Sequence, residues 1–585
     1  MSQKFDSIII ENFNGGEVLS IEPDLLASNQ LQKAINVRFS KAGGVTNRPG
    51  YEEKALAGVV DTSKIQGAFA TASEVFFVAN GNLYVTLEDF SDAFIIKSGL
   101  SATATCRFLE YTGNVYMFNG VDELQWIKIA TSLTPLVAGV SSSLSLQAGQ
   151  GWRMPNTGNI YVVSSSGSDE ILVTAKTNDV LTIAAATVNY SCAAGYKAYY
   201  VESIPEAVAP KFSCGVEFQN VFLAAIPTGK PGENYQGNTL FYSAGGTGVA
   251  PESFHDFVSA PAGFIPCGDG GDITALGKTK TYAVLTKKNS CFVISGFDPT
   301  GGFPLVEPVT TAYGAAGPEC MALVGDQMIL FTGKELKQFG EQVGLNNMVP
   351  SINARFDDKI FTYLKELDED QSDAVMSFNP AQKLLKVWVN DGGGRTCVVY
   401  DDKIDAFSRD YNKPASVVFV YKDETFWGSQ VEAKIFQDEI GFDDSGLAIS
   451  SQIITAEFSA GNPRLSKYFK TLYISGKLGE GTKVNVKIYF DSVVVQEFSL
   501  TAALLVDSVN GTPIGRNRIG GTVIGSSAMG TLAYKFVIEK LLKKRRNVGK
   551  MYIEFSSDGI GQVFEISTCQ IEGNLSKKFD KFIRT

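Results

Sequence analysis

The chain has 585 residues, of which 44% are hydrophobic and 19% charged, a composition typical of folded globular proteins rather than disordered ones. This length exceeds one ordinary hydrophobic core, so two or three domains are expected. The formal net charge is −11, and no segment has the composition of a basic nucleic-acid-binding arm. Sequence-specific binding of DNA or RNA is therefore not expected.

The N-terminus lacks the charged and then apolar layout of a signal peptide, and no run approaches the roughly 18 apolar residues of a membrane span. We therefore expect folding in the cytosol without membrane insertion. In a chain of this size, scattered cysteines without a CxxC pair favour buried reduced thiols over a disulfide framework or a zinc site. The eight cysteines are Cys106, Cys192, Cys214, Cys267, Cys291, Cys320, Cys397 and Cys569.

The first strong local pattern is a hairpin over residues 36–51. Its Gly-Gly pair permits the positive φ that a tight turn needs, and its Pro-Gly pair is typical of a type II turn. We expect its two arginines to anchor the hairpin by bidentate contacts to carboxylates or carbonyls, within the chain or between subunits. The residues to which we assign this structural and assembly role are Asn36, Arg38, Gly43, Gly44, Arg48, Pro49 and Gly50.

Beyond the hairpin, a pattern of two short apolar strands around a turn recurs with different residues each time. Where no insertion intervenes, the units lie roughly 35 to 60 residues apart, which spans the period of β-propeller blades. The sequence therefore predicts an all-β chain with a β-propeller of six or seven blades, or alternatively a set of ordinary antiparallel β-domains. The units cover residues 73–85, 113–121, 216–243, 281–294, 321–339, 384–400 and 417–436.

The predicted domains follow from shifts in composition. A Ser-, Ala-, Thr- and Val-rich segment interrupts the period and is interpreted as a β insertion that projects from a blade loop. Strongly alternating segments near the C-terminus predict a β-sandwich-like domain. The domains are an N-terminal extension with the docking hairpin at 1–52, a propeller body at 53–130 and 211–440, the insertion at 131–210, and the sandwich at 441–585.

Two basic features lie within the C-terminal region. One is a Gly-rich loop at residues 516–521, and the other is a run of Lys and Arg at 543–546 that follows a segment beginning at Tyr534. The run could contact phosphate or an acidic partner. The alternative interpretation is that it is the solvated end of a short helix.

Residues for catalysis are scarce. His255 is the chain's one histidine, which leaves little material for a His-based relay or a multi-His metal site, and no G-x-S-x-G motif accompanies it. Acids at 366–370 and at Asp401, Asp402 and Asp405 could form a glycosidase pair, but adjacent acids in turn-like sequence are usually solvated loops. We therefore expect no enzyme, and no metal or cofactor site.

Five short motifs follow one another near the N-terminus: Gly15-Gly16-Glu17, Leu25-Leu26, Asn36-Val37-Arg38, Gly43-Gly44 and Arg48-Pro49-Gly50. In this order they resemble the N-terminal signature of the tail nozzle proteins of short-tailed bacteriophages, also called tail tubular or head-completion stabilisation proteins. Residues 314–318 with 328–331 are similar to a blade opening of that family. Residues 397–409 look like its strand-turn-aromatic-Ser pattern, with Phe407 where Trp is common.

The resemblance implies a structural protein of a virion tail, made in the host cytoplasm. It implies a homo-oligomeric ring of six copies below the portal and its adaptor, with attachment surfaces for tail fibres or spikes. DNA would leave through the central channel without sequence-specific binding, and an acidic wall would not retain its phosphates. Two alternatives are a carbohydrate-binding or carbohydrate-processing propeller that acts as a receptor-binding tail protein, and a tail hub or baseplate component of a long-tailed phage.

Overall fold

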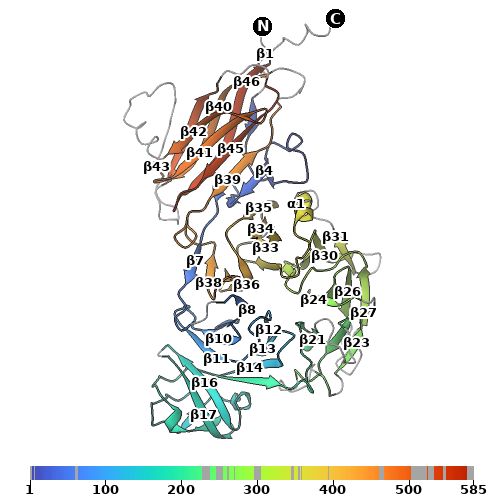
Figure 1. Cartoon of the computed structure of the whole chain (residues 1–585), viewed down its shortest axis with the longest axis vertical. Helices are drawn as coiled ribbons and strands as arrows, with labels where there is room; N and C mark the ends of the chain where they lie inside the picture. Colours follow the sequence, from blue (N-terminus) through green and yellow to red (C-terminus); the bar gives the residue numbers. More distant parts are fainter. Residues whose placement is uncertain are drawn as a thin grey trace.

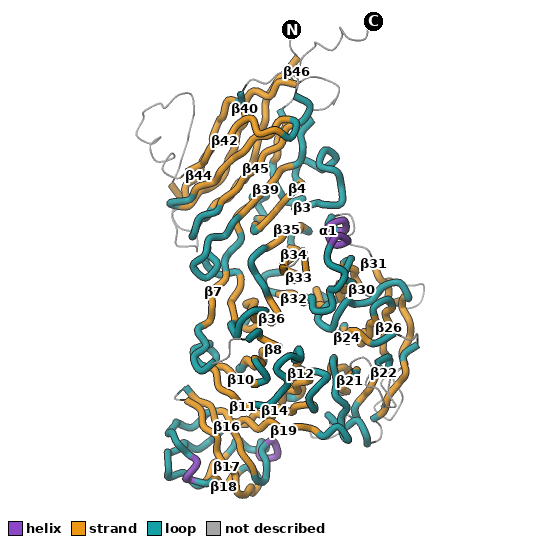
Figure 2. The backbone as a smooth tube through the Cα atoms, viewed as in Figure 1, coloured by secondary structure: helices purple, strands orange, loops and turns teal. Residues whose placement is uncertain are grey.

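The computed structural model of the chain consists mainly of β-strands, with one α-helix in its described part, α1 (Phe361–Glu366) (Figures 1 and 2). The all-β class predicted from the sequence is confirmed. No helix in this part has the length and apolar character of a membrane-spanning segment. The structure describes residues 3–4, 7–59, 63–165, 167–226, 237–244, 254–259, 262–268, 271–295, 305–343, 348–353, 356, 359–392, 394–459, 467–501, 523–524, 533–543 and 548–575.

Most of the described strands form seven antiparallel units of four strands, which we call sheets 1 to 7. Sheet 1 contains β8 (Ile65–Ala70), β9 (Val75–Ala79), β10 (Asn82–Thr86) and β11 (Ala93–Lys97). Sheet 2 contains β12 (Arg107–Tyr111), β13 (Asn114–Phe118), β14 (Leu124–Thr131) and β19 (Lys197–Ile204). Sheet 3 contains β20 (Cys214–Phe218), β21 (Val221–Ala225), β22 (Thr239–Tyr242) and β23 (Gly263–Pro266).

The next four units continue along the chain. Sheet 4 contains β24 (Ile273–Lys278), β25 (Ala283–Lys287), β26 (Ser290–Ser295) and β27 (Leu305–Thr310). Sheet 5 contains β28 (Met321–Val324), β29 (Gln327–Phe331), β30 (Leu336–Val343) and β31 (Met348–Asn353). Sheet 6 contains β32 (Val375–Asn379), β33 (Leu384–Asp391), β34 (Gly394–Asp401) and β35 (Ala406–Asp410). Sheet 7 contains β36 (Ala415–Tyr421), β37 (Glu424–Ser429), β38 (Ile435–Asp438) and, from the N-terminal region, β7 (Tyr51–Lys54).

The seven sheets pack side by side. Strand β9 is buried at every residue, as expected of an apolar run that is covered on both faces. Phe76 packs with Met117 of sheet 2, whereas Phe77 packs with Phe426 of sheet 7. Hydrophobic clusters fill every successive junction, including the one between sheet 7 and sheet 1. The first strands β8, β12, β20, β24, β28, β32 and β36 contact one another in a closed cycle.

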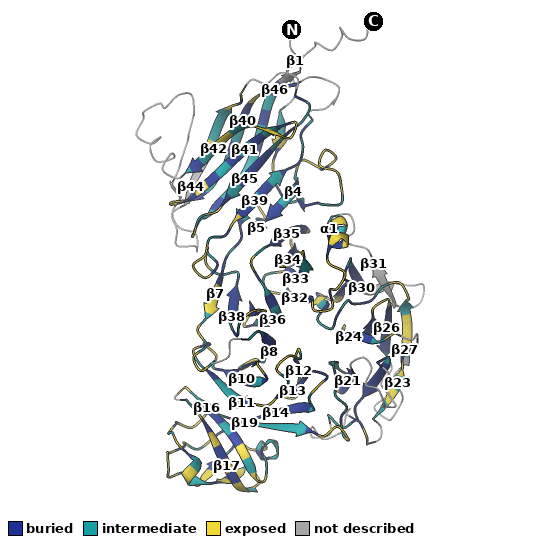
Figure 3. Ribbon diagram, viewed as in Figure 1, coloured by how far each residue is buried: buried dark blue, intermediate teal, exposed yellow. Residues whose placement is uncertain are grey.

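The insertion continues sheet 2 outward. Strand β19 pairs with β14 on one side and with β16 on the other. Strand β17 alternates between buried and exposed residues, so one face of this sheet covers a separate small core and the other is solvated (Figure 3). In Figure 1 the insertion lies at the end of the molecule opposite both termini. Its strands are β15 (Ser143–Ser145), β16 (Gly158–Ser164), β17 (Gly167–Thr177) and β18 (Val180–Ile183).

The C-terminal region forms two facing sheets around a large common core, and strands from the N-terminus belong to both of them. One sheet has the order β43 (Val523–Ile524), β44 (Ala533–Leu541), β40 (Lys467–Gly479), β46 (Phe564–Leu575), β6 (Val45–Asn47) and β5 (Val37–Phe39), with β1 (Gln3–Lys4) and β2 (Ile8–Ile10) also paired to β46. The other extends sheet 6 through β4 (Gln30–Ile35), β39 (Ser451–Thr455), β45 (Met551–Ser557), β41 (Lys483–Phe490) and β42 (Val493–Thr501), with β3 (Gly16–Glu17) paired to β4.

One expectation for this region is wrong. The segment from Tyr534 that could have been a short helix is strand β44, which pairs with β40 along its whole length. Cross-strand pairing here overrides the helix-compatible Leu, Lys and Glu content of the segment. The Gly-rich basic loop at 516–521 and the basic residues 544–546 lie outside the described residues.

Candidate assembly site at the N-terminal hairpin

The hairpin predicted from the sequence is present. Strands β5 and β6 pair antiparallel, with Arg38 opposite Thr46. Gly43 closes the turn with a φ of +91°, and a Cβ there would lie 2.4 Å from Cβ of Asn12, so both conformation and space require glycine. Gly44 donates its backbone N–H to Oγ of Ser40. The hydrogen bond to Ser40 and the close packing against Asn12 therefore hold the turn in place.

Arg48 lies at the end of β6 and is fully buried. Its Nη1 and Nη2 donate to the two carboxylate oxygens of Asp444 at 2.8 and 2.7 Å, and its Nε donates to Asn36 Oδ1 at 2.9 Å. Burial disfavours the charged arginine, but the negative charges of Asp410 and Asp444 outweigh this and raise the pKa of Arg48. The arginine thus joins the hairpin to the segment that follows sheet 7.

The type II turn expected at Pro49 and Gly50 is not present, because Gly50 lacks the positive φ that such a turn requires. The Pro-Gly pair leads the chain into sheet 7 instead. Pro49 accepts a hydrogen bond at its carbonyl from Arg48 Nη1 at 2.9 Å. Gly50 lies so close to the neighbouring segment that a Cβ would come within 1.7 Å of the carbonyl oxygen of Asp443. Tyr51 then begins β7, opposite Asp438 of β38. The Pro-Gly pair therefore leads directly into the N-terminal strand that completes the last sheet.

Arg38 holds two carboxylates from different sheets. It donates to both oxygens of Asp410, at the end of β35, at 2.8 and 2.6 Å. It also donates to both oxygens of Glu439, after β38, at 3.2 and 2.5 Å. Both arginines therefore make the bidentate contacts to carboxylates predicted from the sequence, and they make them within one chain.

These pairs belong to a larger group that we call the buried ion network. Lys386 of β33 donates to Asp438 and Glu439 at 2.7 and 2.6 Å. Lys413 lies between Asp410 and Asp438, at 3.0 and 2.7 Å. Four cations therefore face four anions, which is the balance that buried charges require. The members are Arg38, Arg48, Lys386, Lys413, Asp410, Asp438, Glu439 and Asp444.

The charges of the buried ion network shift the pKa values of its carboxylates. Burial favours the neutral acid at Asp410, but the positive charges of Arg38 and Lys413 outweigh it and hold the pKa well below its usual range. The same balance lowers the pKa of Glu439. Asp444 is the exception, because burial raises its pKa and the contact with Arg48 compensates only in part.

Asn36 connects the hairpin to its surroundings through both its amide and its backbone. It adopts a φ of +52°, a conformation in which asparagine is enriched. Its Oδ1 accepts from Arg48 Nε and from the backbone N–H of Tyr411, and its Nδ2 donates to the carbonyl of Ser450 at 2.7 Å. One side chain thus links the hairpin with sheet 6 and with the start of β39.

A second buried pair was not assigned from the sequence. Arg409 of β35 donates to both carboxylate oxygens of Glu17 at 2.8 and 2.7 Å, and Glu17 also accepts the backbone N–H of Ala34 at 3.0 Å. Gly16 precedes it with a φ of +64°, and a Cβ there would lie 2.8 Å from Cβ of Ala406. The Gly-Gly-Glu motif was visible in the sequence, but its partner lies 392 residues away.

The other candidates from the sequence do not belong to the buried ion network. His255 packs against Trp126 with ring centroids 4.5 Å apart, and burial lowers its pKa to about 4. Asp405 accepts from the hydroxyl of Tyr400 and from Lys359, and Asp401 accepts the N–H of Lys403. These acids stabilise turns and ion pairs.

The remaining candidates are the possible metal ligands and the cysteine thiols of the chain. In the described part of the chain, no group of three or more His, Cys, Asp and Glu residues could hold a metal ion. All eight cysteines are buried and free, which confirms the expected thiols. Burial raises the pKa of Cys106, Cys291 and Cys320 to about 12, so these thiols stay protonated at neutral pH.

Comparisons with known proteins do not assign a family. No known protein family and no curated protein matches the chain. Among solved structures, the computationally designed Ika8 protein is similar over 66% of this chain and 99% of its own, with 11% identity and a TM-score of 0.31. Kluyveromyces lactis Hsv2 is similar over 60% of this chain and 98% of its own, with 8% identity and a TM-score of 0.24. At such scores neither likeness carries an argument about this chain.

Proposed function

We propose that this chain is the repeating subunit of a tail nozzle of a short-tailed bacteriophage, with a seven-bladed β-propeller as its body. The cyclic contacts of the seven first strands support the propeller. The apolar cluster between sheets 7 and 1, which includes Phe77 and Phe426, supports closure of the propeller within one chain. Strand β7 then completes the last blade from the N-terminus, a pairing that removes an exposed sheet edge.

The observation that carries the functional proposal is the joint at the hairpin. Four of the five motifs that resemble the nozzle family make close contacts there: Glu17 binds Arg409, Arg38 and Arg48 bind carboxylates, Gly43 forms the turn, and Gly50 passes a neighbouring backbone. These contacts join the ring of sheets to the C-terminal sandwich. A subunit of a tail that is under mechanical force benefits from a rigid interface between its two domains.

The proposed DNA channel lies between subunits and not through the propeller. The first strands enclose a cavity of about 460 Å³, a size that suits a small molecule and not a nucleic-acid duplex. Phe69 stacks on Phe108 with centroids 6.0 Å apart, and Arg107 pairs with Glu319 at 3.0 Å near the same cavity. A channel for DNA therefore requires several copies around a common axis.

Electron microscopy of the purified full chain tests this proposal. We expect closed rings of six subunits with an axial channel, whose wall is neutral or acidic as the net charge of −11 suggests. A protein that stays monomeric at every concentration, or a channel lined with Lys and Arg, would contradict it. A ring of another symmetry that binds baseplate proteins would instead favour a tail hub of a long-tailed phage.

A further inference from the structure

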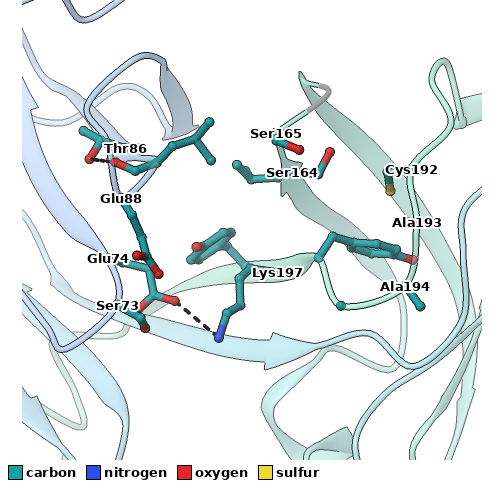
Figure 4. A pocket seen from close by; sticks show the side chains of 15 residues that line it. Ser73, Glu74, Thr86, Glu88, Ser164, Ser165, Cys192, Ala193, Ala194 and Lys197 are labelled. Carbon is teal, nitrogen blue, oxygen red and sulfur yellow. Dashed lines mark hydrogen bonds and ion pairs between the residues drawn. The ribbon is translucent and has the colours of Figure 1, made fainter.

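A groove separates sheet 1 from the insertion (Figure 4). Its main part has a volume of about 360 Å³, and an adjoining part of about 190 Å³ shares Ser73, Glu74 and Lys197 with it. The main volume falls in the range of small-ligand sites. Residues of sheet 1 and the insertion line the groove, and the insertion lies at the end of the molecule opposite the termini (Figure 1). The groove therefore has no part in the contacts that carry the proposed assembly.

At the edge of the groove, a buried carboxylate lies beside an ammonium group. Glu74 is only 6% exposed, and its Oε2 accepts from the hydroxyls of Thr71 and Ser73 at 2.8 and 2.5 Å. Lys197 Nζ lies 3.5 Å from the other carboxylate oxygen. An ammonium group has three donors, and this one keeps donors for a ligand beyond its ion pair. Figure 4 shows the two side chains meeting at the edge of the groove.

The charges around the groove are nearly balanced, which argues against a charged ligand. Three carboxylates, Glu74, Glu88 and Glu110, line it with the cations Lys197 and Arg153, and Glu88 also pairs with Lys422 at 2.7 Å. Burial and the negative charge of Glu74 raise the pKa of Glu110, so an added phosphate would increase an existing repulsion. A cationic ligand is disfavoured for another reason, because Lys197 already occupies the ammonium position beside Glu74.

The remaining lining is neutral. Ser164 and Ser165 face the acid wall from the insertion side, and Ala193 and Ala194 leave room between the walls (Figure 4). The ring of Tyr196 adds an apolar surface. Vicinal hydroxyl groups each donate and accept, so a sugar matches the carboxylate and ammonium of one wall and the hydroxyl of Ser165 on the other, while its C–H face matches the apolar lining.

We propose that this groove binds a neutral saccharide unit of a glycan, held between the carboxylate of Glu74 and the ammonium of Lys197. The site goes beyond the structural role proposed above. It places a recognition surface on the part of the chain farthest from the C-terminal sandwich. Binding at this surface and assembly of the ring are separate properties, and each can fail alone.

The test uses the labelled full chain on an array of neutral and anionic oligosaccharides, followed by saturation-transfer NMR with the neutral glycans that bind. We expect the Ala194→Trp variant to abolish binding by filling the groove from an exposed position. Glu74→Gln should weaken binding about tenfold or more, as expected when a hydrogen bond to a charged group is lost. Glu432→Gln is the matched control, since Glu432 pairs with Lys434 at 3.2 Å outside the groove, and it should bind like the wild type.

Circular dichroism and thermal unfolding of each variant separate a folding defect from a binding defect, and Ala194→Trp needs no change to a buried charge. The proposal is overturned if no neutral glycan binds, or if folded Ala194→Trp binds as well as the wild type. It is also overturned if inorganic phosphate or spermidine, used as anionic and cationic probes, binds in the groove where neutral sugars do not.

Discussion

Arg38 and Asp410 form a bidentate ion pair at 2.8 and 2.6 Å between the N-terminal hairpin and the last strand of sheet 6. The same guanidinium also holds both oxygens of Glu439 beyond sheet 7. One residue near the start of the chain therefore contacts two carboxylates that lie 372 and 401 positions further along the sequence. Closing loops of this length carries an entropic cost, which the ion pairs of this joint help to offset.

Arg48→Ala tests the joint directly. The substitution leaves Asp444 buried without its partner, and breaking a buried pair from one side costs on the order of 3–5 kcal/mol. We expect a corresponding fall in the free energy of unfolding measured with urea, and loss of ring yield in size-exclusion chromatography. Lys434→Ala breaks an exposed pair with Glu53 and should cost less than about 1 kcal/mol. An unchanged ring yield for folded Arg48→Ala would remove the assembly role of Arg48.

The pair of Glu17 and Arg409 allows a double-mutant cycle. Each single change, Glu17→Gln or Arg409→Met, leaves a buried charge uncompensated, whereas the double variant leaves none. We expect each single variant to be strongly destabilised, and the double variant to lose less than the sum, with a coupling of about 1–3 kcal/mol. Urea unfolding of the four proteins measures it. Additive effects would show that the two residues act independently in spite of their contact.

Local patterns in the sequence predicted local structure well and distant partners poorly. The Gly43-Gly44 turn follows from the conformational freedom of glycine, and it is present. Nothing local to Glu17 indicates that its partner is Arg409, because that contact exists only after the last sheets have formed. For the same reason the sequence indicated that Arg38 would bind carboxylates but not which ones.

Two further differences have the same physical origin. The segment from Tyr534 has helix-compatible composition, yet its pairing with β40 makes it a strand. Residues 1–52 are expected to form an N-terminal extension, but β4 lies between β35 and β39, so this segment shares one sheet with the propeller body and the C-terminal region. In both cases the structure depends on pairing between strands that are distant in the sequence. The hydrophobic period and the secondary-structure propensity of a single segment do not indicate such pairing.

Acid should weaken the buried ion network. The pKa values of Asp410 and Glu439 are lower in the folded chain than in the unfolded one. Their stabilising contribution is therefore fully present above the unfolded values, about 4, and is lost as the pH falls toward the lowered folded values. We expect the urea midpoint to fall steeply below about pH 4. High salt should change this acid limb little, because buried pairs are poorly screened. A midpoint independent of pH between about 4 and 2 would contradict the assignment.

His255 is the chain's one histidine, the residue type whose ordinary pKa lies nearest to neutral pH. Burial against Trp126 lowers its pKa to about 4 in the folded state, whereas the unfolded value is about 6.5. Between these two values the unfolded chain binds about one proton more than the folded chain, so stability must fall as the pH is lowered through this window. We expect the free energy of unfolding to decrease from pH 6.5 to pH 5. His255→Phe should abolish the slope in this window while it leaves the steeper acid limb in place, and a slope that persists in this variant would show that another group is responsible.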